Sequence, residues 1–101
     1  MRQAARTDDN HQEIIDALRK VGCSVLDLSR VGSGAPDIAA GRMDINGVKH
    51  NYLIEIKNSN KPPSQRKLTP DQVKFHADWK GQINTVKSVD EALDLVLNIK
   101  R

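Results

Sequence analysis

Three polar side chains in the middle of the chain have types and a spacing that could act together in chemistry. Glu55 and Lys57 stand two residues apart in an apolar, β-branched run at 52–57. Alternate side chains of a strand point to the same face, so this carboxylate and this ammonium should project side by side. Asp37 begins an earlier apolar segment. If the two segments are neighbouring strands, the cluster suits a divalent cation and a phosphodiester.

The donor set of this cluster fits a hard cation. Mg²⁺ commonly takes one or two carboxylates, with water and substrate phosphate completing its shell, and Asp37 and Glu55 supply that minimum. The backbone carbonyl of Ile56 could add a ligand. Glu13 could bind the same ion or a second one, if its helix packs on this side of the sheet. Lys57 could orient or help deprotonate an attacking water and stabilise charge on the phosphate.

The acidic-x-Lys triplet is a weak signal when it stands alone. Such triplets arise by chance, and Asp78-Trp79-Lys80 matches as well. That second triplet falls in an expected helix, whereas Glu55 and Lys57 fall in an expected strand. The alternative interpretation of Glu55 and Lys57 is an ordinary ion pair on an edge strand.

The composition describes one folded domain over residues 1–101. Its charged fraction of 29% and hydrophobic fraction of 38% are typical of a globular chain. The formal net charge of +3 is only mildly basic. The segment 56–70 contains no acidic residue, which suits a polyanion such as DNA but also a solvated loop. The candidate DNA-binding residues of this segment are Lys61, Arg66 and Lys67.

Several classes of site and location are excluded or disfavoured. The single cysteine, Cys23, rules out an internal disulfide and a cysteine-based zinc site, and its setting favours a buried small residue. The histidines His11, His50 and His76 share no close metal-ligand spacing, so we expect structural or surface roles. No apolar run approaches a membrane span, and the first residues lack a signal peptide's apolar region. We therefore expect a cytoplasmic protein without a membrane partner or an organic cofactor.

The expected elements follow the order α-β-β-β-α-β-α, an α/β layered domain with a mixed sheet. A first helix is capped by Asp8 or Asp9 and ends at Gly22. Asn46-Gly47 predicts a two-residue hairpin turn, which makes the strands of Asp37 and Glu55 neighbours. Thr69 and Pro70 open a helix in which Phe75 and Trp79 should be core residues. The expected strands are 23–30, 36–41, 48–58 and 83–88, and a last helix follows at 89–99.

Taken together, these motifs resemble a known family. The matching segments, in order, are Gly34-Ala35-Pro36-Asp37-Ile38, Glu55-Ile56-Lys57-Asn58, and Leu68-Thr69-Pro70-Asp71-Gln72 with Trp79 beyond. They resemble the PD-(D/E)XK nuclease superfamily, and within it the virus-type replication-repair nuclease (VRR-NUC) domain. The resemblance runs from Glu13 to Trp79 and implies a restriction-endonuclease-like core.

The resemblance also implies roles for individual residues. Asp37 and Glu55 would be metal ligands and Lys57 the catalytic lysine. Glu13 would match the family's helix-borne acidic residue, and Gln72 its glutamine after the core motif. Compact members from phages and bacteria resemble Holliday junction resolvases, act as homodimers and serve DNA repair and recombination.

We therefore expect a metal-dependent endodeoxyribonuclease that uses Mg²⁺ or Mn²⁺ in a bacterial cell or a phage-infected host. The expected partner is branched or duplex DNA, with a branched structure preferred on the resemblance and a homodimer expected. One alternative is a flap or nicking nuclease. The other is a catalytically silent DNA-binding subunit with the same fold, and the intact set Asp37, Glu55 and Lys57 argues against it.

Overall fold

The structure, a computed structural model, describes residues 9–58 and 67–100. Its elements follow the expected order α-β-β-β-α-β-α, so this prediction is confirmed. The helices are α1 (His11–Lys20), α3 (Pro70–Asp78) and α4 (Val89–Val96). The strands are β1 (Ser24–Asp27), β2 (Ile38–Met43), β3 (Lys49–Ile56) and β4 (Asn84–Val86). Three of them are shorter than the sequence suggested, whereas β2 has the expected length but lies two residues later in the chain.

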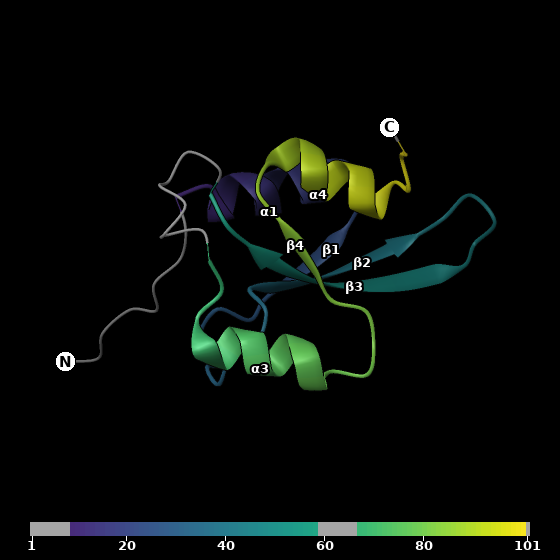
Figure 1. The fold of residues 1–101 in the computed structure, drawn as a ribbon. Coiled ribbons are helices and arrows are strands. Elements are labelled where there is room, and N and C mark those ends of the chain that lie inside the picture. The colour runs from purple at the N-terminus through teal and green to yellow at the C-terminus, as the bar shows by residue number, and fades with distance from the viewer. Residues whose placement is uncertain (1–8, 59–66, 101) are drawn as a thin grey trace.

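The strands form one mixed sheet in the order β1-β2-β3-β4 (Figure 1). The first three strands pair antiparallel, and β4 joins β3 in parallel. The register sets Ile38 of β2 opposite Ile54 of β3. Asp37, directly before β2, therefore lies beside the end of β3 that carries Glu55.

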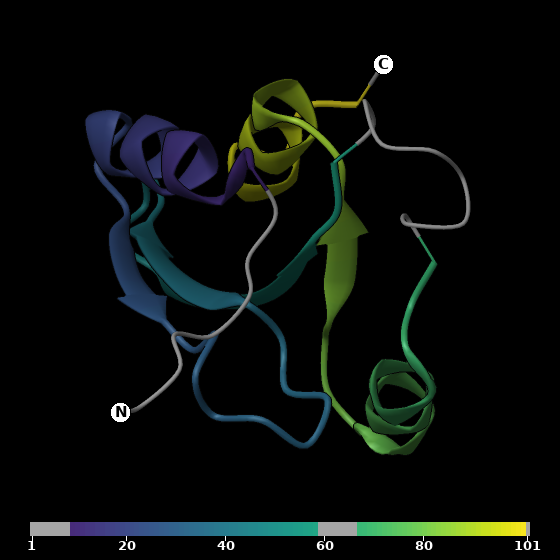
Figure 2. The same ribbon diagram turned by 90° about the vertical axis from the view of Figure 1, so that its left-hand side faces the viewer.

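The helices divide between the two faces of the sheet. α1 and α4 cover one face, and α3 lies on the other (Figures 1 and 2). The core fills the space between the sheet and the pair α1 and α4. Its buried members include Ile14, Ile15, Leu18, Ile38, Ile54, Ile56, Val86 and Val96, together with Cys23 as the sequence predicted. Alternation then directs Glu55 and Lys57, the neighbours of these isoleucines, to the face of α3.

α1 begins one residue later than expected. Its N-cap is Asn10, so the prediction of Asp8 or Asp9 is wrong. The Asn10 side chain makes no capping bond, and its amide instead donates to the carbonyls of Lys57 at 3.4 Å and Lys87 at 3.1 Å. These bonds tie the start of α1 to the segments that follow β3 and β4.

The β2–β3 turn occurs where Asn-Gly predicted it, but it is one residue longer. Asp44 donates its N–H to the carbonyl of Val48 at 2.8 Å, which closes a three-residue loop. Gly47 adopts φ +80° in that loop. This is the common three-residue hairpin, in which a turn is followed by a residue in the left-handed region.

The prediction that Phe75 and Trp79 belong to the core is wrong. α3 contains no fully buried residue, and Trp79 is 45% exposed. The two rings stack on each other instead, with centroids 5.3 Å apart and planes 14° from parallel. Among the described residues no helix is long and apolar enough to cross a bilayer.

Candidate active site

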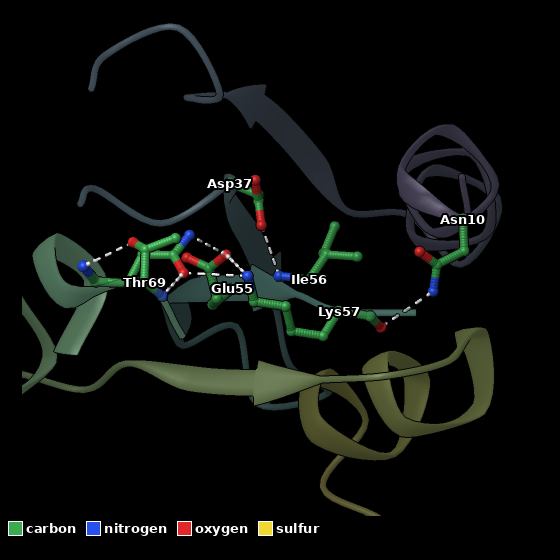
Figure 3. A network of polar contacts seen from close by, with 7 residues as sticks. Asn10, Asp37, Glu55, Ile56, Lys57 and Thr69 are labelled. Atoms are coloured by element: carbon green, nitrogen blue, oxygen red, sulfur yellow. Dashed lines mark hydrogen bonds and ion pairs between the residues drawn. The ribbon is translucent and has the colours of Figure 1, made fainter. Parts of the chain in front are cut away.

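The backbone brings Asp37 and Glu55 together where β2 begins and β3 ends. The Asp37 N–H donates to the carbonyl of Ile54 at 3.1 Å, and its carboxylate Oδ2 accepts from the N–H of Ile56 at 2.7 Å. Ile56 thus joins the cluster through its N–H, while its side chain lies in the core. Glu55 is 1% exposed. Figure 3 shows Asp37 held against Ile56, with Glu55 beside them.

Lys57 is a buried lysine held by two oxygen-bearing side chains. It is 8% exposed, and its backbone N–H continues the β3–β4 pairing by donating to the carbonyl of Val86 at 2.9 Å. Its ammonium Nζ donates to Gln72 Oε1 at 3.1 Å and lies 3.9 Å from Glu55 Oε2. A buried charge needs such partners, because leaving it unpaired would cost several kcal/mol. The ammonium is therefore fixed beside the carboxylate.

Gln72 links the lysine, the glutamate and the start of α3. Its amide Nε2 donates to Glu55 Oε2 at 3.0 Å, while its Oε1 accepts from both Lys57 and the N–H of Thr69 at 2.9 Å. Thr69 Oγ1 in turn accepts from the N–H of Gln72 at 3.2 Å. The result is a capping box, the reciprocal arrangement that the N-cap threonine and the third helical residue form. The same bonds that begin the helix orient the Gln72 side chain.

The glycine of the Gly-Ala-Pro-Asp segment sets how closely α3 approaches this site. Gly34 adopts φ +78°, and a Cβ at this position would collide with the backbone carbonyl of Asp71. The loop that leads into Asp37 therefore packs directly against the first turn of α3. Only glycine combines this backbone angle with this close approach.

Glu13 is not brought to the cluster. It is an exposed residue of α1, and α1 packs on the face of the sheet opposite to α3. Glu13 instead lines an open hollow with Asp16 and Lys20, bounded by Val89 and Asp90 of α4. Glu13 could be a metal ligand only if α1 packed on the same side of the sheet as the cluster. α1 packs on the other side, so the structure does not place Glu13 with the other candidate ligands.

Sequence reasoning missed one side chain near the site, His76 on α3. It follows Gln72 by one helical turn, so both side chains lie on the same side of the helix. The ring Nε2 is buried and has no hydrogen-bond partner among the described residues. Burial, and secondly the positive charge of Lys57, hold the pKa of His76 below its ordinary value. The spacing of four residues from Gln72 was the available signal.

Comparison with known proteins gives one informative match. No protein-family model and no curated protein matches the chain. A solved structure described as "VRR_NUC domain" superposes with a TM-score of 0.59 at 22% sequence identity, covering 92% of this chain and 100% of the other. The chain has the VRR_NUC fold. The fold expected from the sequence motifs is thereby confirmed.

Within the VRR_NUC fold, the cluster consists of Asp37, Glu55, Lys57 and Gln72. Its donor set fits a hard divalent cation, since two carboxylates with water and phosphate suffice for Mg²⁺ or Mn²⁺. Residues 9–58 and 67–100 contain no group of three His, Cys, Asp or Glu side chains placed to bind a metal. Any ion held by Asp37 and Glu55 would therefore need further ligands from water, from substrate or from a backbone oxygen such as the predicted Ile56 carbonyl.

The predicted DNA-binding segment is only partly described. Lys61 and Arg66 lie outside the described residues. Lys67 is exposed, two residues before the Thr69 cap of α3. Its role in binding DNA stays a prediction.

Proposed function

We propose that this protein is a divalent-metal-dependent endonuclease that hydrolyses phosphodiesters in DNA. The observation that supports this most is the contact set of Lys57, whose ammonium is buried, bonded to Gln72 and 3.9 Å from the carboxylate of Glu55. Asp37 adds a second carboxylate on the same side of the sheet. The neighbour described as a VRR_NUC domain has this fold, which supports nuclease chemistry as the first candidate.

Each residue of the cluster has a distinct task in this proposal. Asp37 and Glu55 would hold the cation, which when bound polarises the phosphate and lowers the pKa of water. Lys57 donates hydrogen bonds toward the phosphate oxygens and stabilises the charge that develops on them. Gln72 keeps the lysine pointed at that position, so that little reorganisation is needed during the reaction.

We further propose branched DNA as the preferred substrate and a homodimer as the active form. A two-fold dimer would present two equivalent sites to paired strands, and two-fold symmetry is the commonest closed assembly. A protein that neutralises several phosphates should also bind more weakly as salt is raised. Sedimentation at two protein concentrations would test the dimer independently of catalysis.

The substrate test uses the purified chain with labelled four-way junction, flap and linear duplex of matched sequence. Each DNA is incubated with Mg²⁺, with Mn²⁺ and with a chelator. We expect paired, symmetric cuts in the junction with either metal and none with chelator. Cutting that favours flaps or duplex would retain the nuclease and overturn the junction preference. DNA binding without cutting of any substrate would instead indicate a silent binding subunit.

A further inference from the structure

The hairpin that joins β2 to β3 extends past the helices (Figure 1). Several of its apolar side chains are exposed to solvent. Ile45 is 97% exposed, Met43 60% and Val48 51%. We call these three residues the hairpin tip. A single exposed apolar residue is ordinary, but three that gather at one projecting turn indicate contact with another molecule.

The turn that contains Ile45 is held in one conformation by the side chain of Asp44. Asp44 Oδ1 accepts from the backbone N–H of Asn46 at 2.8 Å and of Val48 at 3.0 Å. Its Oδ2 bonds to His50 Nε2 at 2.9 Å. Ile45 therefore projects from a turn that is already ordered, and a contact made by this residue costs little additional conformational entropy.

The charges around the tip favour a polyanionic partner. Arg42 and Lys49 flank it on the two strands, and Asp44 is the only acidic residue from 42 to 50. The bonds described above turn the Asp44 carboxylate toward the N–H groups of the turn. Arg42 and Lys49 belong to successive pairs of the ladder, so one cation lies on each face of the hairpin at the base of the tip. An apolar point with nearby cations suits nucleic acid, whose bases are apolar on their faces and whose phosphates are anionic.

One continuous strand connects the tip to the candidate active site. β3 begins at Lys49, beside the tip, and carries Glu55 six residues later. At a rise of roughly 3.3 Å per residue, these two positions lie about 20 Å apart. The same distance along a DNA strand corresponds to about six nucleotides. The strand therefore fixes the separation between the tip and the phosphate that would be cut.

We propose that the hairpin tip is a wedge that places Ile45, which lies beyond the start of β3, against an open base step of branched DNA at least about six nucleotides from the scissile phosphate. This inference rests on the proposed nuclease function and adds the means by which a branch is recognised. Apolar wedges of one or two side chains insert between base steps in many DNA-binding proteins, and a two-stranded ribbon fits a groove. A protein partner is disfavoured, since three side chains offer far less than the roughly 800 Å² of a standard interface.

The test compares Ile45→Ser with Val31→Ser, since Val31 is 65% exposed and lies outside the tip. Both are made in the Lys57→Ala background and bound to a junction that carries 2-aminopurine at its branch point, and to a linear duplex. With the tip intact, we expect 2-aminopurine fluorescence to rise on binding. Ile45→Ser should abolish that rise and weaken junction binding about tenfold, with duplex binding changed by less than about twofold. Val31→Ser should behave as the parent.

Three results would overturn the wedge. Equal effects of Ile45→Ser and Val31→Ser would show that the tip does not contact the branch. Loss of a dimer on Ile45→Ser, seen by sedimentation, would assign the tip to a contact between protein chains. A failure of every variant to bind DNA would overturn the wedge together with the nuclease.

A separate result distinguishes the wedge from the nuclease. If the protein with Lys57 intact cuts nothing while the fluorescence rise persists, the nuclease proposal fails and the wedge stands.

Discussion

At the scale of the residue, the site depends on how a lysine is kept in place inside the protein. Lys57 is almost fully buried, and Gln72 occupies one of its ammonium hydrogens while also donating to Glu55. The glutamine amide suits both neighbours, since its oxygen accepts from the cation and its nitrogen donates to the anion. No acidic or basic side chain of this length could do both.

Two substitutions of Gln72 separate its two contacts. Gln72→Ala removes both and should lower the cleavage rate roughly ten- to hundredfold, in the range found when groups that orient a catalytic site are removed. Gln72→Glu keeps an oxygen for Lys57 and for the N–H of Thr69, but sets a carboxylate against Glu55. The cleavage rates of both variants are measured under single-turnover conditions, with circular dichroism as a control for folding. An unchanged rate in Gln72→Ala would contradict the role of Gln72 in orienting Lys57 and Glu55.

His76 makes stability depend on pH. Its pKa lies below the ordinary value in the folded protein, because of burial and then the charge of Lys57. Just below an ordinary imidazole pKa of about 6.5, the unfolded chain therefore binds more protons at this residue than the folded chain. Consequently the titration of His76 increases the free energy of unfolding as pH rises toward about 6.5.

Urea unfolding of the parent and of His76→Gln, from about pH 5 to about pH 7.5, measures this dependence. We expect the parent to gain more stability with rising pH than the variant does. Asp27 and Asp44 should not interfere, because hydrogen bonding from Ser29 and from His50 holds their pKa values below the ordinary carboxyl value. Parallel curves for the two proteins would contradict the assignment to His76.

At the scale of the element, the site is assembled by the meeting of a loop and a helix. The β1–β2 loop approaches the first turn of α3 at Gly34, and that turn carries Gln72 to the end of β3. α3 has no fully buried residue, so apolar burial contributes less to its position than it does for α1 and α4. The capping box and the close contact at Gly34 therefore matter more.

Two glycines of this loop provide a matched pair for a test. Gly34 and Gly32 have nearly equal positive φ angles, +78° and +81°, but a Cβ at Gly32 would meet nothing within 4 Å. Gly32→Ala should cost only the backbone strain of roughly 1–2 kcal/mol. Gly34→Ala should cost about 1–3 kcal/mol more, through overpacking against Asp71, and should also slow cleavage by displacing Gln72. Thermal unfolding and cleavage rates are measured for both variants. Equal losses of stability in Gly32→Ala and Gly34→Ala would contradict the close approach of Gly34 to Asp71.

Local sequence signals predicted where helices and turns begin and end better than they predicted which surfaces those elements pack against. The Thr69 cap, the Gly22 stop and the hairpin at Asn46-Gly47 each act through nearby backbone, so the sequence contains the whole cause. Phe75 and Trp79 have an apolar character that a core and a surface stack share, and only the position of α3 decides between them. Glu13 required knowledge of which sheet face α1 covers, and no residue near Glu13 specifies that face.

At the scale of the whole molecule, one side of the sheet forms the hydrophobic core and the other carries the candidate active site. α1 and α4 close the core on one side (Figure 1). The other side carries Asp37, Glu55 and Lys57 (Figure 3), together with Gln72, which bonds to Glu55 and Lys57. The strand β3 contributes to both, because Ile54 and Ile56 are buried in the core and the residues between and after them face α3. Adjacent positions of one strand therefore contribute alternately to the core and to the candidate active site.

Lys57 offers the most direct test of the proposed active site. Lys57→Ala is compared with Lys74→Ala, an exposed lysine of α3 that pairs with Asp78 at 2.8 Å. The measurement is metal-dependent, single-turnover cleavage of a labelled four-way junction. We expect Lys57→Ala to lose at least about a hundredfold in rate while remaining folded, as for removal of a charge-stabilising donor. Lys74→Ala should stay within about twofold of the parent, since exposed ion pairs contribute little. Equal rates for the two variants would contradict the account.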